Sequence, residues 1–277
     1  MSSPSLRLTP HPPGRAAALT DAEARLPDQP EVDTKDLGRD LDELTERLDR
    51  LQRLLHAEGK RSLLVVLQGR DASGKDGTLR KVFGPLDPLG VTATSFKAPT
   101  EEELRHDFLW RIHRAVPGRG TIGIFNRSHY EDVLSVRVRK LAPESIWRPR
   151  YEQINLFERI LVENATVILK FFLHISREEQ RERLLARLND PEKYWKFDAN
   201  DLEERALWDQ YTVAYGEALA RTSTEAAPWY VVPADSKGVR DVLVARTIVE
   251  ALERVSPTWP GPPRELETLR AALRRGS

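Results

Sequence analysis

The segment 61–79 constrains the fold more than any other part of this sequence. An apolar run, Leu63 to Leu67, ends at Gly69, and Gly74 and Lys75 follow at the start of an amphipathic stretch. This order predicts a buried strand, a glycine-containing turn and a helix N-terminus, the arrangement of a phosphate-binding P-loop. Glycines let successive backbone N–H groups converge on one anion, and the helix dipole favours negative charge there. The sequence therefore predicts a phosphate site at the end of this strand.

The loop departs from the usual P-loop pattern at one position. The pattern G-x-x-x-x-G-K is complete, but Asp76 stands where a Ser or Thr hydroxyl normally binds Mg²⁺. Asp76 could bind the ion or orient one of its waters, or it could simply be a favourable acidic residue in the first helical turn. Asp71 is better placed as a metal ligand or base, because anionic groups must meet the cation near the phosphates. The alternative for Asp71 is an aspartate that stabilises the turn.

Composition excludes several classes of partner. The 277-residue chain has 43 basic and 43 acidic residues, so no overall field attracts nucleic acid or an anionic membrane. The sequence has no cysteine, which excludes disulfides and thiolate metal sites. It has no hydrophobic signal core and no apolar run of transmembrane length. We expect a cytoplasmic protein without nucleic-acid or membrane partners, in which a local patch binds any polyanion.

The chain divides into three parts by composition. Residues 1–35 are rich in proline and predict an irregular arm that could wrap on the domain surface, whereas residues 257–277 predict a linker and a basic amphipathic tail. Between them, residues 36–256 alternate apolar strand patterns with amphipathic helix patterns and predict one domain. This alternation indicates an α/β fold with a parallel sheet covered by helices on both faces. Ligands of such sheets lie at the carboxyl ends of the strands.

Two segments of the predicted domain carry specific helix signals. The leucines from Leu37 to Leu55 recur at spacings of four and three, as in a coiled-coil seam, but the stripe lasts under three heptads. A helix docked on the domain is therefore favoured over a coiled coil. Farther along, Thr100 and Glu103 have the spacing of a capping box, which predicts that a helix begins there.

A second polar cluster follows the short apolar strand TIGIF. Asn126, at its end, could coordinate a metal only as a neutral oxygen, and Arg127 would point toward the P-loop as a clamp for a phosphoryl group. Glu131 and Asp132 add negative charge about one helical turn farther on. His129 is more readily a structural or nucleotide-contact residue than a base, because phosphoryl transfer depends mainly on positioning and charge neutralisation.

A charged helix and a polar-aromatic loop at about 183–200 predict a lid. Arg183 and Arg187 are four residues apart and share one helix face. A closing loop would bring Arg187, Lys193 and Lys196 over the phosphates and exclude water, which a kinase needs to avoid hydrolysing its donor. Acidic residues nearly balance the basic ones here, so a solvated helix remains an equal alternative.

These stretches together resemble the polyphosphate kinase 2 family, which moves phosphoryl groups between inorganic polyphosphate and nucleotides. The matching strings are Gly69–Asp76, Phe125–Leu134, Arg150–Asn155 with Phe157 and Glu158, and Arg187–Phe197. The resemblance implies a P-loop kinase fold similar to thymidylate kinase, with a helical lid. It also implies dependence on Mg²⁺ or Mn²⁺, a basic channel for the polymer, transfer to AMP and ADP to give ADP and ATP, and self-association.

The resemblance also assigns roles to individual residues. Those given to phosphoryl transfer are Asp71, Lys75, Arg127 and Arg187. Further phosphate or nucleotide contacts would come from Gly69, Arg70, Ala72, Ser73, Gly74, Asp76, Asn126, His129, Glu131, Lys193 and Lys196. The metal would be held by Asp71, Glu131 and Asp132. The Glu131–Asp132 pair is similar to the version in members that accept both AMP and ADP.

Two other functions compete with this interpretation. An ATP-dependent nucleoside or nucleoside monophosphate kinase would keep a hydroxyl after Lys75, and Asp76 speaks against it. A nucleotide-binding regulatory protein without turnover would not need the intact Lys75, Asp71 and lid arginines.

Overall fold

A parallel sheet of five strands forms the centre of the protein in a computed structural model that describes residues 6–26 and 36–275. The strand order is β2-β3-β1-β4-β5, and every neighbouring pair is parallel. The strands are β1 (Ser62–Gln68), β2 (Val91–Ser95), β3 (Ile122–Asn126), β4 (Thr166–His174) and β5 (Trp229–Pro233). The predicted parallel α/β sheet is confirmed, and the carboxyl ends of all five strands meet at one edge.

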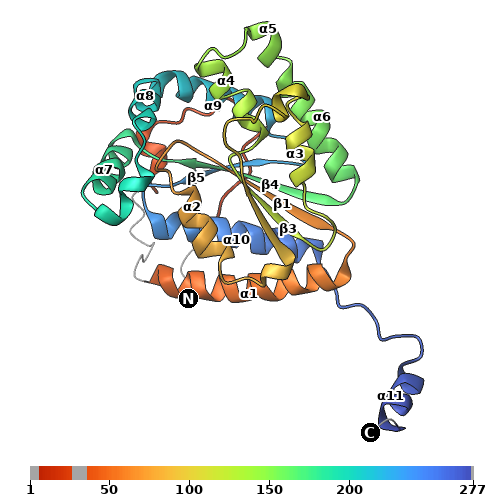
Figure 1. Cartoon of the computed structure of the whole chain (residues 1–277). Coiled ribbons are helices and arrows are strands. Elements are labelled where there is room, and N and C mark those ends of the chain that lie inside the picture. Colours follow the sequence, from red (N-terminus) through yellow and green to blue (C-terminus); the bar gives the residue numbers. More distant parts are fainter. Residues whose placement is uncertain (1–5, 27–35, 276–277) are drawn as a thin grey trace.

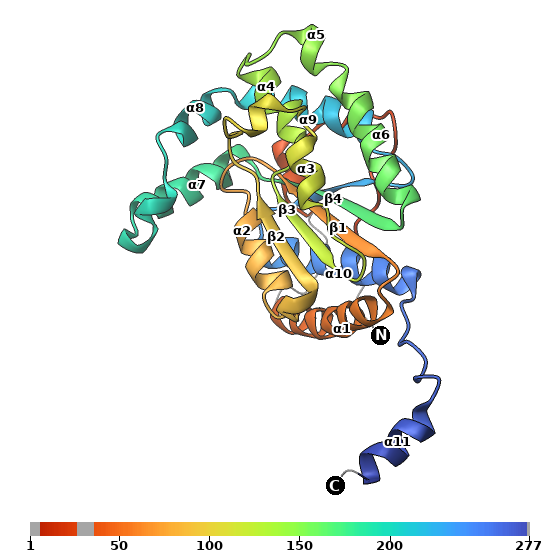
Figure 2. The same cartoon turned by 45° about the vertical axis from the view of Figure 1, so that its right-hand side comes forward.

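Helices cover both faces of this sheet (Figure 1). The longer helices of the chain are α1 (Leu37–Glu58), α6 (Arg150–Glu163), α7 (Arg177–Leu188), α9 (Trp208–Thr222), α10 (Lys237–Val255) and α11 (Leu266–Arg275), of which α11 lies away from the sheet. The shorter ones are α2 (Lys75–Thr78), α3 (Trp110–Ala115), α4 (Ser135–Val138), α5 (Glu144–Trp147) and α8 (Asn200–Ala206). Helices α1 and α10 cover one face, α3, α6 and α9 cover the other, and α7 and α8 lie beyond the carboxyl ends of the strands (Figures 1 and 2).

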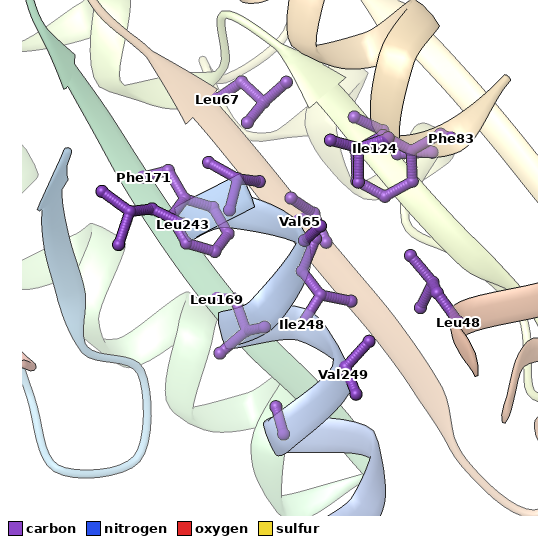
Figure 3. Close-up of a cluster of buried hydrophobic side chains, with 14 of the residues drawn as sticks. Leu48, Val65, Leu67, Phe83, Ile124, Leu169, Phe171, Leu243, Ile248 and Val249 are labelled. Atoms are coloured by element: carbon purple, nitrogen blue, oxygen red, sulfur yellow. The ribbon is translucent and has the colours of Figure 1, made fainter. Parts of the chain in front are cut away.

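The central strand β1 is buried along its whole length. Its alternate side chains enter two different cores: Leu63, Val65 and Leu67 pack toward α1 and α10, whereas Leu64 and Val66 pack toward α6 and α9. Figure 3 shows part of the first core. Burial on both faces explains why the sequence is a continuous apolar run rather than an alternating pattern. The strand therefore gives the loop that follows it a rigid origin.

The leucine stripe near the start of the domain belongs to a docked helix. Leu44, Leu48 and Leu55 of α1 are buried in the core shared with α10 (Figure 3 labels Leu48). The docked helix is thus confirmed over the coiled coil. Gly59 ends α1 in the left-handed conformation, with φ of 62°, which a residue without a side chain adopts readily.

The described part of the N-terminal arm lies against the last strand. The backbone N–H of His11 donates to the carbonyl oxygen of Trp229 at 2.7 Å, and that of Asp235 donates to the carbonyl oxygen of Ala24 at 3.1 Å. Leu19 and Ala24 are buried. This contact covers the outer edge of β5, which would otherwise present unpaired backbone groups. The rest of the predicted 1–35 arm lies outside the described residues.

The helix predicted at Thr100 is wrong in extent. The capping box itself forms, because the backbone N–H of Thr100 donates to Glu103 Oε2 at 2.8 Å and that of Glu103 donates to Thr100 Oγ1 at 3.2 Å. Only a short 3-10 turn follows, however, and His106 returns to an extended conformation. The helix α3 begins later, at Trp110. A cap satisfies local donors, but it cannot extend a helix that has no apolar face to bury.

Candidate active site

The two glycines of the P-loop are required by close contacts. A Cβ on Gly69, whose φ is 153°, would lie 2.7 Å from the carbonyl oxygen of Leu173 on β4. A Cβ on Gly74, whose φ is 104°, would lie 1.9 Å from Arg240 Nη1 on α10. Both values are far below van der Waals contact, so a side chain at Gly69 would clash with the backbone of β4 and one at Gly74 would displace the guanidinium of Arg240. The sequence reasoning found the glycines but not the arginine behind them.

Lys75 folds back over the loop. Its Nζ donates to the carbonyl oxygens of Gly69 at 2.6 Å and Arg70 at 3.1 Å. Burial of the ammonium, together with the positive charge of Arg127, lowers the pKa of Lys75 to about 8. An anion beside the ammonium would stabilise its charged form and raise its pKa again. The position of Lys75 therefore suits a phosphate in the loop.

Asp71 and Arg127 form an ion pair in front of this loop. Arg127 Nη2 lies 2.6 Å from Asp71 Oδ1. Burial lowers the pKa of Arg127, but the carboxylates of Glu131 and Asp71 outweigh that effect and raise it above its ordinary value. Arg127 also has a left-handed backbone, with φ of 62°. The structure thus brings the predicted loop aspartate and the predicted clamp arginine into contact.

Asp76 and Asn126 also meet. Asn126 Nδ2 donates to Asp76 Oδ1 at 2.6 Å, which links the start of α2 to the end of β3. Asp76 also occupies the first turn of α2, where a negative charge interacts favourably with the helix dipole. Both side chains face the groove described next.

A large basic groove runs from the P-loop to the lid segment, with a volume of about 2140 Å³. Among the described residues that line it, ten are Lys or Arg and four are Asp. The basic residues are Lys75, Arg80, Lys97, Arg127, Arg183, Arg187, Lys193, Lys196, Lys237 and Arg240. The formal charge of the whole chain is zero, so this groove is a local concentration of positive charge. Its shape and charge suit an extended polyanion.

A smaller aromatic pocket of about 370 Å³ adjoins the groove. Its lining consists of Gly69, Arg70, Asp71, Arg127, Glu131, Ser135, Gln180, Glu204, Trp208, Tyr211 and Tyr215. Among the described residues, Asp71 and Arg127 are the two that line both spaces. The three aromatic residues lie on α9 at spacings of three and four, which in the sequence cannot be told from an ordinary core stripe. Sequence reasoning therefore missed them.

Arg70 belongs to the aromatic pocket rather than to the groove. Its guanidinium lies 3.8 Å from the centroid of the Trp208 ring, and Nη2 donates to Thr212 Oγ1 at 2.5 Å. Burial lowers the pKa of Arg70 to about 10. Its contacts connect the P-loop to α9, so the predicted phosphate contact of Arg70 would have to be made from the pocket side.

The predicted lid segment has a fixed part and a projecting part. Arg183 on α7 donates to the carbonyl oxygens of Ala72, Ser73, Ala234 and Asp235 at 2.7–3.2 Å. Arg187, one turn farther on, donates to the carbonyl oxygen of Lys196 at 3.0 Å and lies 3.3 Å from Asp201 Oδ2. Lys193 pairs with Asp190. The end of α7 and the turn after it project from the domain in Figure 2.

The remaining loop residues have different surroundings. Ala72 lines the groove in a left-handed conformation, with φ of 63°. Ser73 is buried, and its carbonyl oxygen accepts from Arg183 at 3.2 Å and from Arg240 at 3.3 Å. Arg240, which sequence reasoning did not identify, thus supports the loop from α10.

Two of the predicted site residues, His129 and Asp132, lie away from both the groove and the aromatic pocket. His129 is fully buried, with Nε2 3.3 Å from Glu158 Oε1, and it lines neither the groove nor the aromatic pocket. Asp132 also lines neither; it pairs with Arg150 at 3.0 Å, and burial raises its pKa to about 6. Glu131 does line the aromatic pocket and accepts from Ser135 Oγ at 2.5 Å. The 3-10 turn His129–Asp132 explains this divergence, because its successive side chains point in different directions.

The described residues contain no group of three or more His, Cys, Asp or Glu that could enclose a metal ion. Asp71 and Glu131 nevertheless both line the aromatic pocket beside the P-loop. Mg²⁺ prefers oxygen ligands and is usually bound by one or two carboxylates together with waters and substrate phosphates. The donors present therefore fit Mg²⁺ held jointly by protein and substrate. Separately, none of the described helices is long and apolar enough to span a membrane.

A family model, several known proteins and a solved structure are similar to this chain. The family model "Polyphosphate kinase 2 (PPK2)" matches residues 31–259. The "AMP/ADP-polyphosphate phosphotransferase" of Meiothermus ruber is 55% identical over 219 residues, which cover 79% of this chain and 82% of that protein. The "ADP-polyphosphate phosphotransferase" of Rhodopseudomonas palustris is 47% identical over 78% of each chain. The crystal structure of polyphosphate kinase 2 from Arthrobacter aurescens TC1 superposes with a TM-score of 0.87 at 40% identity, covering 98% of this chain and 100% of that one.

Proposed function

Because this chain belongs to the polyphosphate kinase 2 family, we infer that it transfers the terminal phosphoryl group of inorganic polyphosphate to AMP and ADP. The products are ADP and ATP, and a polymer one phosphate shorter. A phosphate oxygen of the nucleotide forms a bond to the terminal phosphorus of the polymer, and the phosphoanhydride bond behind that phosphorus breaks. One bridging P–O bond replaces another, which makes transfer in the opposite direction chemically possible. The observation that carries the proposal is the meeting of the basic groove and the aromatic pocket at Asp71 and Arg127.

We assign polyphosphate to the basic groove. A polymer of phosphates has no base to recognise and needs only repeated anion contacts along its length. Ten cationic side chains provide such contacts, and four of them, Arg183, Arg187, Lys193 and Lys196, come from the lid segment. Charge-assisted bonds from arginine to phosphate are among the stronger hydrogen bonds in proteins.

We assign the nucleotide to the aromatic pocket. The pocket is smaller than the groove, and Trp208, Tyr211 and Tyr215 give it apolar walls that suit a base. Glu131 and Glu204 on the same walls would repel a long polyanion. Asp71 and Arg127 then lie where the phosphate of the acceptor meets the end of the donor.

Catalysis in this arrangement comes from charge neutralisation and alignment. The nucleophile is an oxygen of an already ionised phosphate, so no general base is required. Lys75 and Arg127 would stabilise the charge that spreads over the transferring group, and Arg187 would join them when the lid closes. The same closure would exclude water from the donor. His129 has no part in these steps, since it is buried elsewhere.

We propose that Mg²⁺ is the metal and that Mn²⁺ can replace it. Asp71, with Glu131 as a second carboxylate, would hold the ion together with phosphate oxygens, whereas Asp132 pairs with Arg150 and lines neither space. When bound, the ion would neutralise negative charge on the phosphates that it contacts. Asp76 and Asn126, which are hydrogen-bonded to each other at the groove, could orient its waters.

Three finer expectations accompany the proposal. Glu131, as an additional carboxylate at the acceptor side, would position the shorter AMP more than it positions ADP. The protein is expected to act in the cytoplasm. It is also expected to self-associate, and described residues of one chain line both the aromatic pocket and the groove.

The test is an assay with AMP or ADP, polyphosphate and Mg²⁺, and without ATP as donor. Formation of ADP and ATP supports the proposal. Turnover that occurs only when ATP is the donor would instead identify an ATP-dependent nucleoside monophosphate kinase, and binding without turnover would identify a regulatory protein.

A further inference from the structure

A fully buried network of ionised and hydroxyl groups lies behind the active-site turn. Lys170 on β4 and Glu158 on α6 are 0% and 2% exposed, and Lys170 Nζ lies 2.5 Å from Glu158 Oε2. Tyr130 donates its hydroxyl proton to Glu158 Oε1 at 2.8 Å, and the hydroxyl oxygen accepts from Lys170 Nζ at 2.9 Å. The third proton of Lys170 goes to the carbonyl oxygen of Thr222 at 2.7 Å. Each proton of the ammonium therefore has a partner.

The charges of this network are balanced. Lys170 is the cation and Glu158 the anion, and the His129 ring also contacts Glu158, with Nε2 3.3 Å from Oε1. One buried cation then faces one buried anion. A buried ion pair of this kind is often no more stabilising than apolar residues of the same volume. Stability alone therefore does not account for its presence in the core.

The network is attached to the active site at two points. Tyr130 directly precedes Glu131 and follows Arg127 by three residues, in the turn that joins β3 to α4. Thr222 is the last residue of α9, the helix whose other residues Trp208, Tyr211 and Tyr215 line the aromatic pocket. Lys170 and Glu158 thus connect the turn that carries the clamp to the helix that forms the pocket wall.

The turn needs such support because its backbone is strained. Arg127 has φ of 62°, a left-handed conformation that side-chain-bearing residues adopt only when the surroundings impose it. On the loop side, the N–H of Arg127 donates to the carbonyl oxygen of Leu67 at 3.0 Å, and Gln68 contacts Ser128 Oγ at 3.1 Å. On the core side, the support is the side chain of Tyr130, held by Glu158 and Lys170.

We propose that Tyr130, Glu158 and Lys170 are positioning residues for the phosphoryl-transfer reaction. They fix the turn so that Arg127 reaches the transferring group and Glu131 reaches the acceptor. This inference rests on the proposed function, and it extends that function to a network that touches neither substrate.

Tyr130→Phe is the first test, because it removes one hydroxyl and leaves the volume and the Lys170–Glu158 pair in place. We expect kcat for AMP with polyphosphate to fall about tenfold, since small displacements of catalytic groups reduce rates by such factors. The KM for polyphosphate should stay within about twofold, because most of the groove lies away from this turn. ADP binding, measured by titration calorimetry without polyphosphate, should weaken about fivefold.

Tyr230→Phe is the matched control, since Tyr230 is a buried tyrosine on β5 in the other core. It should leave kcat and ADP binding unchanged. A triple variant, Tyr130→Phe with Glu158→Leu and Lys170→Met, replaces the network by apolar side chains and guards against an unfolded single variant. If the network positions the turn, kcat of the triple variant should fall about tenfold or more, even where its thermal midpoint equals that of the wild type.

Wild-type kcat and wild-type ADP affinity in a folded Tyr130→Phe or triple variant would overturn the inference, as would an equal loss in Tyr230→Phe. Wild-type protein is assayed in the same series. Absence of its turnover would be a failure of the proposed function, and the calorimetric comparison would then still decide whether the network shapes the nucleotide pocket.

Discussion

Asp71 Oδ1 and Arg127 Nη2 lie 2.6 Å apart at the place where the basic groove meets the aromatic pocket. Asp71 comes from the P-loop after β1, and Arg127 comes from the end of the neighbouring strand β3. The pairing of these two strands therefore places a carboxylate and a guanidinium between two spaces of different chemistry. This relationship is the structural basis for transfer from a polyanion on one side to a nucleotide on the other.

Lys75→Met should reduce kcat by about 100-fold or more, because it removes a cation aimed at the transferring phosphate. It should not reduce the free energy of unfolding at pH 7. Burial lowers the pKa of Lys75 to about 8, so below that pH the folded state carries a buried charge that the unfolded state solvates. This buried charge lowers the free energy of unfolding by about 3 kcal/mol, and the loss disappears as pH rises from 8 toward 10.5. Kinetics and chemical denaturation measure the two effects; a lower stability of Lys75→Met at pH 7 would contradict this account.

The pKa of Lys75 also predicts how kcat/KM depends on pH. In the free enzyme Lys75 loses its proton near pH 8, so kcat/KM for polyphosphate should fall above that pH. Bound phosphate would stabilise the ammonium, so kcat itself should remain level to a higher pH. Rate measurements between pH 6 and 10, with Lys81→Ala as a control for an exposed lysine on the next helical turn, check this prediction. A kcat/KM that stays constant through pH 9 would exclude it.

Arg187→Ala should reduce kcat by about 100-fold or more, as expected for an arginine that stabilises a transferring phosphoryl group. Its effect on the thermal midpoint should be small, because the polar contacts of this side chain within the described residues are with Lys196 and Asp201, both near the projecting segment. Arg181→Ala is the matched control on the same helix, where an exposed arginine pairs with Glu178 and Glu182. Equal rates for the two variants would remove Arg187 from the transfer step.

Glu131→Asn should reduce AMP phosphorylation about tenfold more than ADP phosphorylation. The reason is that Glu131 lines the acceptor pocket and would position the shorter nucleotide, whereas the additional phosphate of ADP can reach the loop without it. Separate measurements of kcat/KM for the two acceptors decide the point. Equal losses would show that Glu131 does not discriminate between them.

Salt should affect the two substrates differently. Binding of a polymer to a groove lined by ten Lys and Arg residues should weaken about tenfold or more between about 50 and 200 mM salt, because each charge contact releases counterions. The KM for AMP should rise much less, since the aromatic pocket offers few cations. Initial rates at several salt concentrations measure both constants. Equal salt dependence would argue against placing the polymer in the groove.

Much of this arrangement could be predicted from local patterns. The apolar run before Gly69 and the glycines after it specify the P-loop, and strand–helix alternation specifies the parallel sheet that brings Arg127 to Asp71. Patterns that depend on tertiary contacts could not be interpreted in this way. Trp208 has the spacing of a core residue but lines a pocket, and Arg240 meets Gly74 only through packing of α10. Neighbours in sequence also diverge, since Glu131 faces the pocket whereas His129 and Asp132 are buried against other partners.

The most direct measurement of the central claim is a time course with AMP, polyphosphate and Mg²⁺ in the absence of ATP. Nucleotides are separated and quantified, with Lys75→Met and a sample containing EDTA as controls. The account predicts that ADP forms first and ATP follows, and that both controls give neither product. Failure to phosphorylate AMP or ADP from polyphosphate, with activity appearing only when ATP is supplied as the donor, would contradict it.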